Sequence, residues 1–308
     1  MPKLIDETPD ALRVSPDSPL PVKRRQKLFA VLPTLLTLGN AACGFGAITF
    51  AAKVGPTAAY GSELWIAAGL IYVAMIFDMF DGSAARWANQ TSEFGAQLDS
   101  LCDAISFGVA PAFLMIQFTV GRHLVEERLS VEPLLAYPPR IVWLIAVLFV
   151  FCVLLRLARF NVETDEDDSH EFFSGLPSPA GAGVLASFPI FIWGLRQLAE
   201  ETEIAGHGLS LHVLAALKSL LPLVTVVVAF LMVSRIRYPH FFNQLFGRRS
   251  RKHVIYLIAT GAVIVVIPGA ALMLLFGYFA FVAPAQAAYR KVFRKDASAA
   301  DAGSDFDG

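Results

Sequence analysis

The chain has 308 residues, of which 56% are hydrophobic and only 17% are charged, and its formal net charge is -1. The apolar residues gather in runs that are too long for ordinary core helices, which excludes a pair of soluble domains. This composition indicates a polytopic membrane protein that contacts membrane lipids, and no nucleic-acid partner is expected.

The predicted elements are membrane-spanning helices, because a bilayer span needs about 20 predominantly apolar residues. The apolar runs cover residues 28–53, 64–81, 94–119, 139–158, 176–195, 211–234, 253–267 and 269–288. Only Pro268 and Gly269 separate the last two runs, so we predict an all-α protein of about eight spans, with six or seven as alternatives. Residues 1–27 form a polar, basic segment, residues 28–290 the transmembrane domain, and residues 291–308 a polar tail that is predicted to be disordered.

The distribution of basic residues predicts the orientation in the membrane. With eight spans, 19 of the 25 Lys and Arg residues fall on the side that carries both termini. The positive-inside rule places this side in the cytoplasm. We therefore expect a multi-pass protein of the cytoplasmic membrane, and the polar stretch at 78–103 faces the cytoplasm.

That stretch, DMFDGSAARWANQTSEFGAQLDSLCD, carries four aspartates between two apolar runs. Asp78 and Asp81 are three residues apart, and Asp99 and Asp103 are four apart. On helices, these spacings keep each pair on one face, about 4.5 Å and about 6 Å apart along the axis. Two helix ends that face each other would present four carboxylates around one small volume.

Such a cluster needs compensating positive charge. Four unpaired aspartates inside the membrane would cost on the order of 10 kcal/mol, although a position near the membrane edge lowers this cost. Two divalent cations about 3.5–4 Å apart fit the predicted volume. Hard carboxylate oxygens suit Mg²⁺ or Mn²⁺. The simpler alternative is a solvated acidic loop. Such a loop, however, does not require the aspartates at both of its ends to be three or four residues apart, as on one face of a helix.

The aspartates belong to a longer pattern with fixed offsets. It comprises Asp78, two residues, Asp81-Gly82, two residues, Ala85-Arg86, eight residues, Gly95, three residues, Asp99, three residues and Asp103. This pattern resembles, position for position, the signature of the CDP-alcohol phosphotransferases. The resemblance implies their membrane fold, in which CMP is displaced from a CDP-linked donor by an alcohol. It also implies a homodimer.

The resemblance also implies roles for individual residues. Asp78, Asp81 and Asp99 would hold two divalent cations, and Asp103 would complete the cluster and act as general base for the acceptor's hydroxyl. The CDP-diacylglycerol donor would be met by Gly82, Arg86 and Ser92. Physical chemistry agrees at two of these positions, because glycine allows close backbone approach and arginine is a fork donor for phosphate oxygens.

Further stretches bear on the acceptor alcohol. These are LPTLLTLGNAACGFGAI in the first span, LLRLARFNVE at the end of the fourth, FFSGLPSPAGAG at the opening of the fifth and LMVSRIRYPHF at the end of the sixth. Together they resemble the CDP-diacylglycerol–serine O-phosphatidyltransferases, which implies CDP-diacylglycerol and L-serine as substrates. Thr34 departs from that family, in which asparagine commonly follows the proline of span one.

The serine carboxylate would pair with Arg156 and Arg159, which share a helix face, and Asn161 would add a polar contact. The alternative for the arginines is that they reach lipid phosphates. Thr37 and Asn40 in the first span either line the same cavity or form hydrogen bonds between packed helices.

Other functions stay open at the level of sequence. The same reaction with glycerol 3-phosphate, an inositol phosphate or choline is the first alternative. An ion-coupled transporter is the second, although its usual pair of broken helices at the bilayer midplane has no match here. A structural membrane protein with an incidental acidic loop is the third.

Overall fold

The computed structural model describes residues 22–53, 62–88, 93–120, 135–163, 172–201, 206–239 and 267–303. The helices are α1 (Val22–Ala52), α2 (Ser62–Ala88), α3 (Glu93–Asp103), the π-helix η1 (Ala104–Val109), α4 (Ala110–Val120), α5 (Pro139–Glu163), α6 (Ser178–Glu201), α7 (Gly206–Val233) and α10 (Pro268–Gly303). Two three-residue strands, β1 (Phe172–Ser174) and β2 (Arg237–Pro239), pair antiparallel. The all-α prediction is confirmed, since this small ladder is the only sheet among the described residues.

Seven segments of the described chain are long and apolar enough to cross a membrane: 33–52, 62–82, 93–120, 139–162, 178–197, 215–233 and 269–286. They match seven of the eight runs expected from sequence. The remaining run, 253–267, lies outside the described residues except for Ile267. Helices are the natural outcome for such runs, because lipid offers no partner to backbone N–H and C=O groups.

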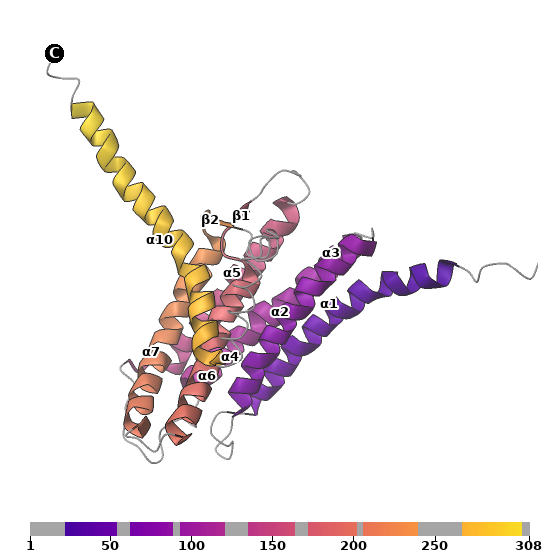
Figure 1. Cartoon of the computed structure of the whole chain (residues 1–308), viewed down its shortest axis with the longest axis horizontal. Coiled ribbons are helices and arrows are strands. Elements are labelled where there is room, and N and C mark those ends of the chain that lie inside the picture. Colours follow the sequence, from indigo (N-terminus) through magenta and orange to yellow (C-terminus); the bar gives the residue numbers. More distant parts are fainter. Residues whose placement is uncertain are drawn as a thin grey trace, which may run out of the picture.

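The helices pack as a bundle in which α1 lies along α2, and α6 contacts α2, α7 and α10 (Figure 1). α5 packs mainly against α7 and α4. The third span is one continuous path through α3, η1 and α4. α10 runs out from the bundle at one end (Figure 1).

The last turns of α10 extend beyond the apolar run. The helix continues to Gly303 and covers most of the segment 291–308, for which the sequence predicts disorder. Alanine, the best helix former, occupies four of the eight positions from 296 to 303. The high alanine content explains why this segment is helical in the structure although its polar composition predicts disorder.

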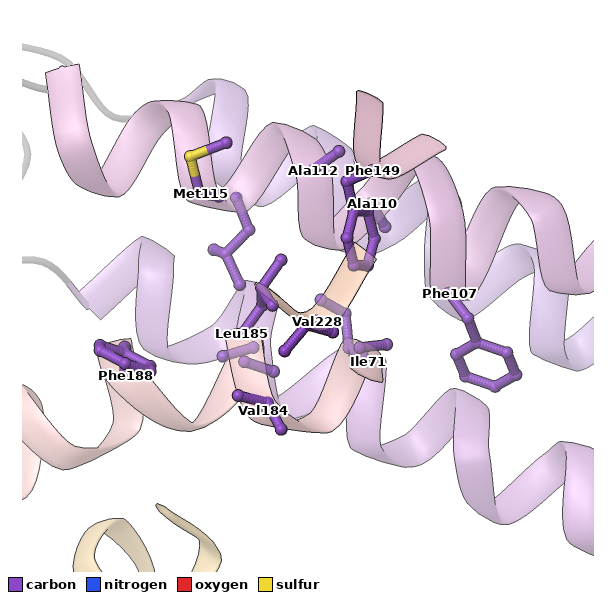
Figure 2. Packing of buried hydrophobic residues seen from close by; sticks show 14 of the residues in the cluster. Ile71, Phe107, Ala110, Ala112, Met115, Phe149, Val184, Leu185, Phe188 and Val228 are labelled. Carbon is purple, nitrogen blue, oxygen red and sulfur yellow. The ribbon is translucent and has the colours of Figure 1, made fainter. Parts of the chain in front are cut away.

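The apolar core lies at the middle of the bundle, where buried side chains from α1, α2, η1, α4, α5, α6 and α7 meet. Figure 2 shows Ile71 of α2, Phe107 of η1, Leu185 of α6 and Val228 of α7 within this cluster, all of them fully buried. Outward-facing positions carry large apolar side chains as well, for example Phe45, which is 69% exposed. Exposed apolar surface of this kind is what a lipid environment favours.

The β1–β2 ladder fixes the entry to α6 at one end of the bundle. Gly175 follows β1 with φ of +85°, and a Cβ there would lie 3.0 Å from the Ser234 carbonyl oxygen, so only glycine fits. Tyr238 of β2 is buried, and its hydroxyl donates to the Ala280 carbonyl at 3.0 Å. Burial raises the pKa of Tyr238 to about 12, so the hydroxyl remains a donor at neutral pH.

Candidate active site and metal centre

Three aspartates converge where α2 passes the last turns of α3. Asp78, Asp99 and Asp103 each offer one carboxylate oxygen, and these oxygens all lie within 4.8 Å of one another. We call these three residues the acidic cluster. Asp99 and Asp103 lie one turn apart on α3, and Asp78 comes from the last turns of α2. The convergence expected for two facing helix ends is therefore found for these three residues.

Asp81, the fourth aspartate, lies beside the acidic cluster rather than in it. Its side chain is buried, one helical turn after Asp78 on α2, and the charge of Asp99 acts on it. Thr37 of α1 is within hydrogen-bonding reach of this carboxylate. The same hydroxyl lies 3.0 Å from the Pro33 carbonyl oxygen, and its single hydrogen serves one acceptor at a time.

The acidic residues are undersatisfied within the described part of the chain. Asp81 Oδ2 and Asp99 Oδ1 are buried and have no hydrogen-bond partner there. Leaving even a neutral buried acceptor unpaired costs about 1–3 kcal/mol, and a charged one costs more. Hard oxygen donors from several carboxylates within 4.8 Å form the donor set that divalent cations prefer. The residues present therefore fit a bound divalent metal.

Asn40 of α1 reaches across to the acidic cluster. Its side-chain Nδ2 donates to Asp103 Oδ1 at 2.8 Å, and both side chains are buried. Asn40 Oδ1 is buried too and has no partner among the described residues. The structure thus brings Asn40 into the site and adds a contact that the sequence left open.

The π-helix η1 begins directly after Asp103. Ser106 in η1 is fully buried, and its hydroxyl donates to the Asn40 backbone carbonyl at 2.9 Å. A Cβ at Gly44 would lie 2.7 Å from the Ser106 Cα, so glycine is what allows α1 to approach η1 this closely. Single π-turns inside α-helices often occur at functional sites.

Arg156 lies near the end of α5. Its positive charge interacts electrostatically with the carboxylates of both Asp78 and Asp103. Its Nη1 donates to the Ser178 hydroxyl at 2.8 Å, at the first residue of α6. Its Nε is buried and has no hydrogen-bond partner in the described segments. Arg156 is therefore held by Ser178 and keeps unused donor capacity.

Two other predicted acceptor residues lie on the same helix. Asn161 is hydrogen-bonded to Ser100 of α3: its Nδ2 lies 3.0 Å from the Ser100 Oγ. Ser100 is next to Asp99, so this pair fastens the end of α5 to the helix that carries the acidic cluster. Arg159 is half-buried on α5, between Arg156 and Asn161.

The residues expected to meet the CDP group are only partly described. Gly82 is a half-buried residue of α2 that directly follows Asp81. Arg86 belongs to the last turns of α2, but its side chain lies outside the described part. Ser92 lies outside the described residues.

Sequence reasoning missed Ser178 and Ser106. Ser178 lies in the stretch FFSGLPSPAGAG, in which the sequence pointed to no single site residue, and Ser106 stands in an otherwise apolar run. A buried serine inside a membrane span is the signal that could have drawn attention to Ser106, because its hydroxyl needs a partner.

Comparison with known proteins identifies the family. The family model described as CDP-alcohol phosphatidyltransferase matches residues 30–231. The chain belongs to this family. The match includes every residue of the acidic cluster as well as Asn40, Arg156 and Ser178.

Several curated relatives share the name CDP-diacylglycerol–serine O-phosphatidyltransferase. The one from Mycobacterium tuberculosis is 37% identical over 166 residues, which cover 53% of this chain and 50% of the relative. The one from Methanocaldococcus jannaschii is 34% identical over 207 residues, covering 67% and 76%. The one from Bacillus subtilis is 30% identical over 210 residues, covering 68% and 90%. The chain thus spans about half the length of the mycobacterial relatives that it matches and most of the Bacillus protein.

Proposed function

We propose that the chain transfers the phosphatidyl group of CDP-diacylglycerol to the hydroxyl of L-serine, which gives phosphatidylserine and CMP. The observation that carries this proposal is the acidic cluster: three carboxylates with oxygens within 4.8 Å, in a membrane bundle of the CDP-alcohol phosphatidyltransferase family. The names of the relatives support serine as the acceptor.

In this proposal two divalent cations, Mg²⁺ or Mn²⁺, are held by Asp78, Asp81 and Asp99, and Asp103 completes the set. When bound, such cations neutralise pyrophosphate charge and stabilise the departing CMP. The unpartnered buried oxygens of Asp81 and Asp99 support this assignment, because a cation satisfies them. The chain's own task is then to position the reacting groups.

Asp103 acts as the general base in the proposed reaction. The serine hydroxyl oxygen attacks the phosphorus that carries the diacylglycerol, a new P–O bond forms, and the P–O bond to CMP breaks. The hydroxyl proton passes to an Asp103 carboxylate oxygen. Burial of Asp103 beside Asp78 and Asp99 supports this role, since the base then lies next to the proposed metal ligands.

The donor's CDP group is proposed to lie against Gly82, with Arg86 and Ser92 contacting its phosphates or ribose. Arg156 is proposed to bind the serine carboxylate, assisted by Arg159 and Asn161. The unpartnered Nε of Arg156 supports this, because a carboxylate oxygen would satisfy it. The Asn161–Ser100 hydrogen bond gives Asn161 a second role, because it links the end of α5 to α3.

The remaining proposals concern the surroundings of the site. We propose that the active site opens to the cytoplasm from the cytoplasmic membrane, which follows from the excess of basic residues on that side. We also propose a homodimer, by analogy with the family. Residues 28–290 form the proposed catalytic domain, between a basic N-terminal segment and a polar tail.

CMP release by purified protein in detergent tests the proposed function. CDP-diacylglycerol and Mn²⁺ are supplied with L-serine, glycerol 3-phosphate, an inositol phosphate or choline, one acceptor at a time. Release with serine alone supports the proposal. Release with another acceptor alone keeps the reaction type and overturns the serine assignment. No release with any acceptor, from protein shown to be folded, overturns the enzymatic proposal.

A further inference from the structure

We infer that Asn40 is a positioning residue for Asp103: it holds one carboxylate oxygen of the proposed base and so sets how the carboxylate faces the acceptor. This inference rests on the proposed function, in which Asp103 takes the hydroxyl proton. It concerns a residue of α1, a helix that carries none of the four aspartates.

The contact itself is short, buried and specific in direction. Asn40 Nδ2 lies 2.8 Å from Asp103 Oδ1, and Asn40 has no solvent-exposed surface. A carboxylate only accepts, so the amide nitrogen must face it, and the amide has a single usable orientation. Hydrogen bonds to an ionised acceptor are among the stronger ones in proteins.

Asn40 is a poor choice if it served packing alone. Its Oδ1 is buried without a partner among the described residues, so the side chain uses only part of its hydrogen-bonding capacity. A leucine of similar size would fill this space without an orphaned acceptor. The polar side chain makes physical sense if its bond to Asp103 matters for function.

The backbone of Asn40 is fixed relative to Asp103 by a second bond. The Ser106 hydroxyl donates to the Asn40 carbonyl at 2.9 Å, and Ser106 lies in η1, directly after Asp103. Gly44 lets the two helices approach, since a Cβ there would lie 2.7 Å from the Ser106 Cα. The side chain of Asn40 therefore starts from a backbone that is tied to the same helix as its target.

This arrangement has a consequence for Asp103. With Oδ1 engaged by Asn40, the carboxylate cannot rotate freely, so the directions in which its oxygens face the proposed cations and the acceptor's hydroxyl are set. Base catalysis depends on such geometry, because the accepting oxygen must lie within hydrogen-bond reach of the hydroxyl. Asn40 acts through Asp103 and need not touch a substrate.

The experiment is a double-mutant cycle with four proteins: wild type, Asn40→Leu, Asp103→Asn and the double variant. Steady-state CMP release gives kcat and KM for both substrates. We expect Asn40→Leu to lower kcat about 100-fold, while KM for CDP-diacylglycerol stays within about twofold. The double variant should be no slower than Asp103→Asn within about threefold, since both changes disable one group.

Thr225→Val in α7 is the matched control, because Thr225 is also fully buried and its hydroxyl bonds within its own helix, to the Leu221 carbonyl. It should keep wild-type kcat and KM. Thermal unfolding in detergent is measured for every variant, and Asn40→Ala replaces Asn40→Leu if the leucine variant does not fold.

Three outcomes overturn the inference: an unchanged kcat in a folded Asn40 variant, a loss expressed mainly in KM for CDP-diacylglycerol, or a double variant about 100-fold slower than Asp103→Asn. If wild type uses an acceptor other than serine, only the proposed function fails, and the cycle is decided with that acceptor. If folded wild type releases no CMP at all, both ideas fail, because no reaction remains for Asn40 to support.

Discussion

Two buried polar regions of the molecule follow opposite rules. Around Ser219 of α7, each group has a partner: the hydroxyl donates to the Ala215 carbonyl at 3.0 Å and accepts from the Leu135 N–H at 3.0 Å. The Tyr137 hydroxyl donates to the Ser219 carbonyl at 3.0 Å. At the acidic cluster, carboxylate oxygens gather within 4.8 Å, and Asp99 Oδ1 lacks any partner among the described residues.

The comparison shows two kinds of buried polar group. Those around Ser219 stabilise the fold, whereas those of the acidic cluster destabilise it locally and depend on the rest of the fold to offset the cost. The Ser219 contact links α7 to the chain before α5 and leaves nothing for a ligand to satisfy. The acidic cluster is locally unfavourable because like charges repel and buried acceptors stay unpaired. The surrounding helices must supply that free energy, as is usual at functional sites.

The largest effect should come from Asp103. Asp103→Asn keeps the size of the side chain but removes the basic carboxylate, so we expect kcat for CMP release to fall at least about 1000-fold. Thermal unfolding should occur at or above the wild-type temperature, because one of the repelling charges is gone. A folded variant with more than a tenth of wild-type activity would contradict the role of Asp103 as base.

Metal dependence should distinguish the cluster from ordinary acidic residues. EDTA should abolish CMP release and excess Mn²⁺ should restore it. Asp99→Asn should raise the Mn²⁺ concentration for half-maximal activity at least about tenfold, because a charged ligand is lost. Glu93→Gln is the control: Glu93 is an exposed acid in the first turn of the same helix, and its loss should change nothing. Activity that persists in EDTA would contradict the metal proposal.

Arg156 should affect one substrate more than the other. Arg156→Lys keeps the positive charge but loses the planar fork, including the Nη1 that donates to Ser178. We expect KM for L-serine to rise about tenfold, while KM for CDP-diacylglycerol stays within about twofold. Arg140→Lys, at the exposed start of α5, is the control. Equal changes in both KM values would indicate a general disturbance of the site and not serine recognition.

The sequence predicted those parts of the molecule that depend on local periodicity. Long apolar runs became spans, and the four-residue spacing put Asp99 and Asp103 on one face of α3, because helix geometry fixes which residues share a face. The meeting of Asp78 with this pair depends on how α2 and α3 face each other. The position of Asp81 beside the cluster depends on how α2 turns against α3. Spacing alone does not determine that rotation.

Contacts between residues far apart in the chain could not be predicted from the sequence. Asn40 meets Asp103 across 63 positions, and Arg156 meets Ser178 across 22. Each pairing depends on helix packing and on single side-chain conformations that no periodic pattern encodes. The π-turn after Asp103 is a similar case, since it depends on the close approach of α1 at Gly44.

The smallest effect should come from the satisfied region. Ser219→Ala leaves the Leu135 N–H without its side-chain acceptor, and we expect a loss of about 1–2 kcal/mol in the free energy of unfolding. kcat and both KM values should remain at wild-type level, because no charge near the acidic cluster changes. Ser187→Ala is the matched control, since that buried hydroxyl donates only within α6, to the Val184 carbonyl. It should cost less, because no group outside its helix loses a partner. If Ser219→Ala lowered kcat as much as Asn40→Leu, the distinction between the two regions would fail, and buried polar contacts in this bundle would support activity wherever they lie.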